Sequence, residues 1–382
     1  MLILPGPNGN LPVCPGLPVE RLHGGEPIIA PTAHWWESGV TFNTATVYLP
    51  RSAAHDPLIA RLLETDELDD PKLRDGIVAA HYRARPLHDP GFRFTRSFTG
   101  LACFTPDTRH LLARRAAPLI SPSVRATDDD GLGVEDPRVT QIGDAYYAVY
   151  CGVQDVPEAH GWKANLCAAR SADLLHWEKL GALRGDINCT NNKDGVYFPK
   201  AIDGQYLFLH RPMRGPMREW AIHLATSDAP DGVWRDCGEV LRAHPNPALR
   251  TSWVGAGSVP IPLGARRYLV IFHTGHFHRD GRREYDLDAA ILNFARFDPS
   301  HPERLLDARL DRIMVPETET EVNGPFPDSV ANVLFTCGTY VYRDDLYILY
   351  GGGDTYVMSA RLKLAALLDR LEGAKARELV SA

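Results

Sequence analysis

The chain has 382 residues, of which 44% are hydrophobic and 23% are charged, and its formal net charge is −7. This composition is typical of a globular protein with a large core, and the acidic balance excludes a general nucleic-acid binder, which would carry a basic field. The 32 glycines and 30 prolines favour many turns over long helices.

The chain carries no targeting or redox signature that would place it outside the cytoplasm. Its seven cysteines are widely spaced and form no Cys-x-x-Cys pair, so neither a zinc site nor a disulfide framework is predicted. The first residues lack the basic and apolar regions of a signal peptide, and no apolar run reaches membrane-spanning length. We therefore expect a cytoplasmic protein with no membrane partner and no nucleic-acid partner.

In chain order, a proline- and glycine-rich N-terminal arm over residues 1–25 precedes a repeating region over residues 26–360. Each repeat has an apolar strand, a Gly or Asp turn, an aromatic-rich strand and a strand that ends in small residues. The five copies begin near residues 42, 135, 197, 255 and 332. Helical spacing of apolar residues predicts one helix over residues 56–65 and a C-terminal helix over residues 361–382.

Five units of three or four short strands predict an all-β fold, a five-bladed β-propeller with a C-terminal helix. Each blade leaves a hydrophobic face uncovered, and radial packing covers it. The first strand of each blade lines the central channel. This geometry is expected to bring together residues from all five repeats, namely Asn43, Asp136, Phe198, Gly255 and Asn332.

Two adjacent carboxylates, Glu135 and Asp136, open the second repeat. Pro137 favours an extended backbone before it, and neighbouring side chains of an extended segment point to opposite faces. We therefore expect only one of the two carboxylates to face a site, with Arg138 on the same face as Asp136. A carboxyl group near a guanidinium suits a general acid or a substrate clamp. A surface ion pair at the start of a strand is the alternative.

Basic side chains stand at or near strand ends in several repeats, including Arg83, Lys193, Arg211 and His273. Each one alone could be an ordinary exposed strand end. Together, cations that converge on one channel indicate an anionic ligand, because Arg and Lys are suited to holding carboxylate or phosphate.

The chain resembles glycoside hydrolase family 130, the mannoside phosphorylases and related β-mannosidases. The matching motifs are Gly133-Val-Glu-Asp-Pro-Arg-Val139, Lys193-Asp-Gly-Val-Tyr-Phe-Pro199, Leu209-His-Arg-Pro212, Gly255-Ala-Gly257, Asn332-Val-Leu-Phe-x-Cys-Gly338 and Tyr350-Gly-Gly-Gly-Asp354. They span roughly residues 40–360 in the order of the family, whose fold is a five-bladed propeller.

The resemblance implies a role for each matching position. Asp136 would be the general acid of an inverting reaction, passing its proton through a sugar hydroxyl. Asn43, Arg83 and Asp354 match positions that hold the mannosyl unit, and Glu135, Arg138 and Phe198 are further candidate substrate-binding residues. The implied phosphate-binding residues are Lys193, Arg211, His273 and Tyr285. Inorganic phosphate would be a co-substrate, and no other cofactor is expected.

The choice between phosphorolysis and hydrolysis depends on the nucleophile. An inverting hydrolase needs a second carboxyl group to activate water, whereas a phosphorylase needs a cationic cradle for phosphate. Family phosphorylases usually carry Lys where Trp253 stands here, and Glu219 and Glu284 are candidate bases by position only. The retained phosphate positions favour a β-mannoside phosphorylase that forms α-mannose 1-phosphate. An inverting β-mannosidase and a non-catalytic oligosaccharide-binding propeller are the alternatives.

The histidines at 273, 276 and 278 are spaced like metal ligands, but no set of carboxylates and thiolates stands near them in the sequence. We therefore expect no metal, and we expect His276 and His278 at the acceptor end or in a surface loop.

Tryptophans at positions 35, 36 and 253 are candidates for stacking on sugar rings, with core packing as the alternative. We expect a small oligosaccharide as the binding partner. The sequence leaves the linkage, the acceptor sugar and homo-oligomer formation open.

Overall fold

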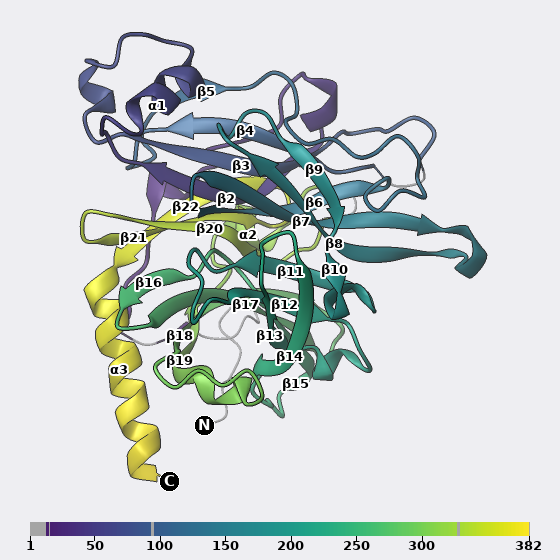
Figure 1. Cartoon of the computed structure of the whole chain (residues 1–382), viewed down its shortest axis with the longest axis vertical. Coiled ribbons are helices and arrows are strands. Elements are labelled where there is room, and N and C mark those ends of the chain that lie inside the picture. Colours follow the sequence, from purple (N-terminus) through teal and green to yellow (C-terminus); the bar gives the residue numbers. More distant parts are fainter. Residues whose placement is uncertain (1–12, 15, 93–94, 327–328, 382) are drawn as a thin grey trace.

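Figure 1 shows the computed structural model of the chain, which describes residues 13–14, 16–92, 95–326 and 329–381. Five β-sheets are arranged as the blades of a propeller, as the repeats predict. Most of the expected arm, residues 1–12 and 15, lies outside the described residues, as does residue 382 of the expected C-terminal helix. No described helix is both long and apolar enough to cross a bilayer.

Each blade is built from strands that follow one another along the chain. Blade 1 contains β2 (Val40–Leu49), β3 (Ile77–Arg85), β4 (Phe98–Phe104) and β5 (Leu111–Arg114). Blade 2 contains β6 (Gly133–Ile142), β7 (Ala145–Val156), β8 (Gly161–Ser171) and β9 (Glu178–Ala182). Blade 3 contains β11 (Asn192–Tyr197), β12 (Tyr206–Pro212), β13 (Ile222–Ser227) and β14 (Val233–Leu241), with β10 (Arg184–Gly185) at its edge.

The last two blades follow the same order. Blade 4 contains β15 (Leu249–Ala256), β17 (Arg267–His278), β18 (Arg283–Asn293) and β19 (Leu306–Met314), and β16 (Ile261–Gly264) also pairs with β17. Blade 5 contains β20 (Leu334–Tyr342), β21 (Asp345–Gly352), β22 (Tyr356–Lys363) and β1 (Glu20–Arg21).

The described residues also form α-helices and short 3₁₀ helices between the strands. The α-helices are α1 (Asp56–Leu63), α2 (Glu319–Val322) and α3 (Leu364–Ser381). The 3₁₀ helices are η1 (Leu22–Gly25), η2 (Trp35–Glu37), η3 (Pro71–Leu73), η4 (Pro157–Ala159), η5 (Asp186–Asn188), η6 (Met217–Glu219) and η7 (Pro302–Leu305). In Figure 1 α3 runs along one side of the ring, where Leu367 and Leu371 are fully buried.

The two ends of the chain meet in blade 5. β1 pairs antiparallel with β22, with Glu20 opposite Arg361 and Arg21 opposite Ala360. The Arg21 guanidinium also donates to the buried carboxylate of Glu321 over 2.8 Å. Residues near the N-terminus thus supply the outer strand of the last blade and close the ring.

The innermost strand of blade 3 differs from its predicted position. The third repeat was expected to begin at Tyr197, but β11 ends there. Pro199 has no N–H to donate to a ladder, so the strand does not continue through it. The Phe198 N–H still donates to the carbonyl of Leu207 in β12 at 3.0 Å, and its ring packs edge-on against Tyr268 at 5.1 Å and Phe294 at 5.3 Å.

The innermost strands of blades 1, 2 and 3 each contain a break in register. The break falls at Asn43 in β2, at Asp136 in β6 and at Asp194 in β11, and these residues have φ values of 44°, 51° and 58°. Asp and Asn tolerate this left-handed conformation better than most residues, and a bulge redirects the side chains around it. The three bulges aim polar side chains toward neighbouring blades.

Candidate active site

Asp136 lies at the junction of blades 1 and 2. Its Oδ1 accepts a hydrogen bond from Asn43 Nδ2 at 2.8 Å and another from Arg83 Nη1 at 3.0 Å. Arg83 Nη2 donates to Glu135 Oε1 at 2.6 Å. The expectation that the two carboxylates point to opposite faces is therefore wrong. The left-handed backbone of Asp136 interrupts the strand alternation, and both carboxylates contact one guanidinium.

Glu135 links Arg83 to Lys193, because its Oε2 accepts a hydrogen bond from Lys193 Nζ at 2.9 Å. Burial would raise the pKa of Glu135, but the charges of Arg83 and Lys193 hold that pKa down at about 2. Burial lowers the pKa of Lys193, yet the charge of Glu135 outweighs it and the net shift is upward. Glu135 is thus an ionised carboxylate held between the side chains of Arg83 and Lys193.

A second carboxylate, Asp194, stands at the centre of the expected phosphate-binding group. Its Oδ1 lies 3.3 Å from Arg138 Nη2, and its Oδ2 lies 2.8 Å from Arg211 Nε and 3.5 Å from His273 Nε2. Asp194 was not predicted from the sequence. The Asp194-Gly195 pair was the available signal, since Asp-Gly marks breaks in regular strands.

Several polar atoms in this group lack a hydrogen-bond partner within the described part of the chain. They are Asp194 Oδ2, Arg211 Nε and both ring nitrogens of His273. The contact of Asp194 Oδ2 with Arg211 Nε is therefore an ion pair without an aligned hydrogen bond, and its contact with His273 Nε2 is a polar contact, because burial lowers the pKa of that imidazole. Buried polar atoms without partners carry a free-energy cost, which a bound polar ligand would remove.

Two motif glycines allow close approach in this region. A Cβ on Gly255 would overlap the carboxylate of Asp194 and the ring of His273, and a Cβ on Gly351 would overlap Asn43 Oδ1. The Gly-Ala-Gly and Gly-Gly-Gly motifs therefore leave room for functional side chains of their own and of neighbouring blades.

Aromatic rings from blades 4 and 5 surround His273. Its ring lies 4.2 Å from that of Phe335 and 5.9 Å from that of Tyr285. Burial lowers the pKa of His273, although Asp194 opposes this shift, and burial raises the pKa of Tyr285. Trp253 is only 2% exposed and packs 5.4 Å from Tyr285. Trp253 thus supports Tyr285 from behind and offers little surface to a sugar.

Asp354 follows β21 in a left-handed turn, with φ of 51°. Burial raises the pKa of its carboxyl to about 6, with Arg83 opposing the shift and the charge of Asp136 adding to it. Asp354 therefore lies within electrostatic range of both residues and changes charge close to neutral pH.

The other candidates from the sequence lie elsewhere. Phe198 is a core residue, because its strand ends before it. Glu219 pairs with Arg218 in the exposed η6. Glu284 is fully buried and accepts from His278 Nε2 at 2.9 Å.

His276 and His278 were expected at the acceptor end or in a surface loop, and the structure places both in a strand rather than a loop. Both are buried in β17, and His276 Nε2 lies 3.0 Å from Asp286 Oδ2. Each stands an odd number of positions from His273 in the strand, so their side chains point to the opposite face of the sheet from that of His273. The carboxylates beside them come from β18, which the sequence spacing did not indicate.

A cavity of about 590 Å³ opens beside the Glu135 cluster. Its lining residues include Arg83, Glu135 and Lys193, together with Arg85 from the end of β3 and Trp162 from the hairpin of β7 and β8. This hairpin projects from the ring in Figure 1. Trp162 is 51% exposed, and Lys193 Nζ lies 5.9 Å from its ring centre. The cavity thus combines charged groups at its base with an exposed aromatic ring.

Comparisons with known proteins agree with this arrangement. Residues 113–373 match the model of the family described as beta-1,4-mannooligosaccharide phosphorylase, glycoside hydrolase family 130. A 1,2-beta-oligomannan phosphorylase of Thermoanaerobacter sp. (strain X514) is 28% identical over 89% of this chain and 95% of its own length. A beta-1,2-mannobiose phosphorylase of Listeria innocua is 30% identical over 63% of this chain and 60% of its own length.

Solved structures share the fold. The beta-1,2-mannobiose phosphorylase from Listeria innocua, solved in complex with beta-1,2-mannobiose, superposes with a TM-score of 0.67 at 22% identity. The match covers 93% of this chain and 99% of that structure. At this identity the likeness concerns the fold alone.

Proposed function

The chain belongs to glycoside hydrolase family 130, and we propose that it is an inverting phosphorylase of β-mannosides that uses inorganic phosphate and releases α-mannose 1-phosphate. The hydrogen bonds that fix the carboxyl group of Asp136 between Asn43 and Arg83 are the observation that carries this proposal. They hold a carboxyl group in one orientation on an otherwise rigid ring, as general acid catalysis requires.

In this proposal Asp136 supplies the proton that the leaving sugar takes up, through a hydroxyl of the mannosyl unit. Arg83, Asn43 and Asp354 hold that unit. Arg83 and Asn43 both contact Asp136, so the sugar and the acid share the same supports. Glu135, tied to Arg83 and Lys193, keeps the guanidinium in place.

Phosphate is proposed to bind at Arg211, His273 and Tyr285, with Lys193 at the side of the cavity. Arg211 Nε and the two ring nitrogens of His273 have no hydrogen-bond partner in the described part of the chain, which supports this location, since phosphate oxygens accept hydrogen bonds from such groups. Phosphate acts as the nucleophile, so the reaction needs no protein base. Attack on the face opposite the departing sugar inverts the anomeric centre.

A specific observation favours hydrolysis as the second candidate function. Asp194 places a negative charge among the residues proposed to bind phosphate, and its ion pair with Arg211 already neutralises part of the charge of that guanidinium. A carboxylate in that position could activate water instead. Trp253, buried where family phosphorylases usually carry Lys, removes one further cation.

For the substrate we propose a β-1,2-linked mannoside, because two relatives carry names that specify this linkage. The test is to incubate the purified protein with β-1,2- and β-1,4-mannobiose, each with and without phosphate, and to separate the products by ion chromatography. Sugar phosphate formed from the β-1,2 disaccharide only when phosphate is present supports the proposal. Free mannose alone, at equal rates with and without phosphate, supports the hydrolase.

A further inference from the structure

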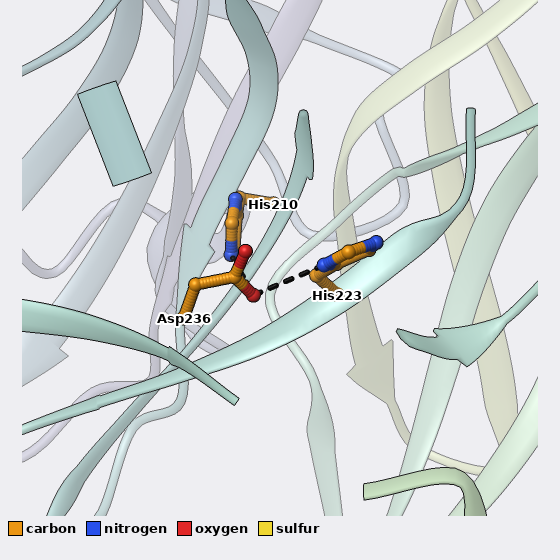
Figure 2. Close-up of side chains that lie close together, drawn as sticks. All are labelled: His210, His223 and Asp236. Atoms are coloured by element: carbon orange, nitrogen blue, oxygen red, sulfur yellow. Dashed lines mark hydrogen bonds and ion pairs between the residues drawn. The ribbon is translucent and has the colours of Figure 1, made fainter. Parts of the chain in front are cut away.

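Three strands of blade 3 bring two histidines and an aspartate together (Figure 2), and none of the three has a role in the proposed reaction. His210 is on β12, His223 on β13 and Asp236 on β14. Asp236 Oδ1 lies 3.0 Å from His223 Nδ1 and 3.6 Å from His210 Nε2. Among the described residues, this is the one group of three His, Cys, Asp or Glu side chains whose ligand atoms all lie within 4.8 Å of one another.

His210 is fully buried, and not every polar atom of His210 and its neighbour Asn192 has a hydrogen-bond partner in the described ranges. Asn192 Nδ2 lies 2.8 Å from His210 Nδ1. His210 Nε2 points at the cluster, yet it has no hydrogen-bond partner in the described ranges, and the same holds for Asn192 Oδ1. A buried ring nitrogen aimed at a histidine and a carboxylate, with nothing bonded to it, is the feature that calls for a ligand.

We propose that His210 Nε2, His223 Nδ1 and Asp236 Oδ1 form a binding site for a divalent transition metal ion, with Zn²⁺ as the preferred ion. Two imidazoles and one carboxylate are ligands that zinc commonly takes. Zinc bonds of about 2.0–2.1 Å place neighbouring ligand atoms of a tetrahedral site about 3.3 Å apart. The separations of 3.0 and 3.6 Å lie on either side of that value.

The surroundings can adjust to a metal ion, although one buried hydrogen bond is lost. Arg214 Nη1 lies 3.4 Å from Asp236 Oδ2, but its side chain is 53% exposed and can turn into solvent. The Gly238 N–H donates to Asp236 Oδ1 at 3.0 Å and would orient the carboxylate for binding. A metal on His210 Nε2 places the ring proton on Nδ1, and the unpartnered Oδ1 of Asn192 can accept it once the amide turns. That turn gives up the bond between Asn192 and the carbonyl of Ile187.

The site would join three strands beside the proposed phosphate-binding group. Arg211 follows His210 in β12 and points to the opposite face, toward Asp194. A metal ion that links β12 to β13 and β14 therefore stiffens the strand that carries Arg211. Its direct effect is on stability and metal content, and neither measurement depends on the proposed reaction.

The test uses the full chain, stripped with a chelator and titrated with Zn²⁺ by calorimetry and by thermal unfolding. We expect one Zn²⁺ per chain and a rise in Tm that the chelator reverses. His223→Ala and Asp236→Asn should each weaken Zn²⁺ binding at least about 100-fold, because each removes one of three protein ligands. His244→Ala is the matched control, since His244 pairs with Asp311 at 2.8 Å without a third ligand, and it should bind Zn²⁺ like the parent chain.

Cobalt gives a second measurement that does not depend on the stability of a variant. Co²⁺ added to the stripped protein should produce the visible absorption of a four-coordinate ion, and His223→Ala should abolish it. The proposal is overturned if the parent chain takes up no stoichiometric metal, or if His223→Ala and Asp236→Asn bind Zn²⁺ as tightly as His244→Ala. In either case the three residues form only a hydrogen-bonded group.

Discussion

Asn43 donates a hydrogen bond to the carboxylate of Asp136 over 2.8 Å, although 93 positions separate the two residues. They stand on the innermost strands of adjacent blades, each in a left-handed conformation at a break in register. Packing of one blade against the next therefore sets the direction of the proposed acid, and a change at Asn43 acts on Asp136 through this bond.

Asn43→Ala removes that hydrogen bond, and it also costs roughly 1–2 kcal/mol of stability because Ala tolerates the left-handed backbone at this position less well than Asn. A hydrogen bond to a charged group contributes about 1.5–3 kcal/mol, so we expect kcat/KM to fall about 10- to 100-fold. Steady-state kinetics on the β-mannobiose that proves active checks this. The control is Asn165→Ala, which removes a buried amide that bonds to Asp129 and Gln154 outside the site. An equal loss in both variants would show that Asn43 acts only through stability.

Gly255→Ala places a methyl group against the carboxylate of Asp194 and the ring of His273. Overpacking of this kind costs about 1–3 kcal/mol of unfolding free energy, which a domain of this size tolerates. Displacing these groups by about 1 Å should lower kcat about 100-fold.

Urea unfolding and kinetics measured together separate these two effects of Gly255→Ala. Gly373→Ala, in α3 with open space around its Cα, should change neither activity nor fold. Full activity in Gly255→Ala would contradict the role given to Asp194 and His273.

We expect the ionisation of Asp354 to determine how kcat/KM falls at acidic pH. Its pKa is about 6, so the carboxyl group takes up a proton as the pH falls through that value. If the carboxylate holds the mannosyl unit by accepting hydroxyl hydrogen bonds, kcat/KM should decline below about pH 6. Asp354→Asn should be slower at neutral pH and should lack this decline. An unchanged acidic limb in the variant would assign it to another group.

Trp162 should bind the part of the substrate that extends into the cavity. The ring is half exposed above Lys193. Removing a stacking partner worth about 0.5–1.5 kcal/mol should raise KM about 3- to 10-fold in Trp162→Ala, with kcat little changed. Trp35→Ala is the control, because Trp35 is 49% exposed but is not among the residues that line this cavity. Equal effects in the two variants would exclude a specific role for the hairpin.

The propeller could be predicted from the sequence, because alternating apolar strands and turns recur five times. The prediction from strand alternation was wrong at Asp136, because the left-handed backbone there brings the carboxylates of Glu135 and Asp136 to the same guanidinium, that of Arg83. The same local effect concealed Asp194. An Asp before Gly is typical of a turn. Nothing in the third repeat indicates that Arg138 and His273, which belong to other blades, lie close to Asp194.

Other parts of the site depend on contacts between distant segments, which a repeat pattern does not contain. Phe198 was expected in the channel because the strand was expected to run through Pro199. The proposed metal ligands lie on three strands with no motif spacing, so only the folded blade shows them together.

The central claim is that Asp136 drives cleavage of a β-mannoside by phosphate, and ³¹P NMR of the reaction with β-1,2-mannobiose tests it most directly. The parent chain should produce one new sugar phosphate resonance, that of α-mannose 1-phosphate, in step with mannose release. Asp136→Asn, folded to the same Tm, should produce none. Mannose release without any change in the phosphate signal, or an active Asp136→Asn, would contradict the account.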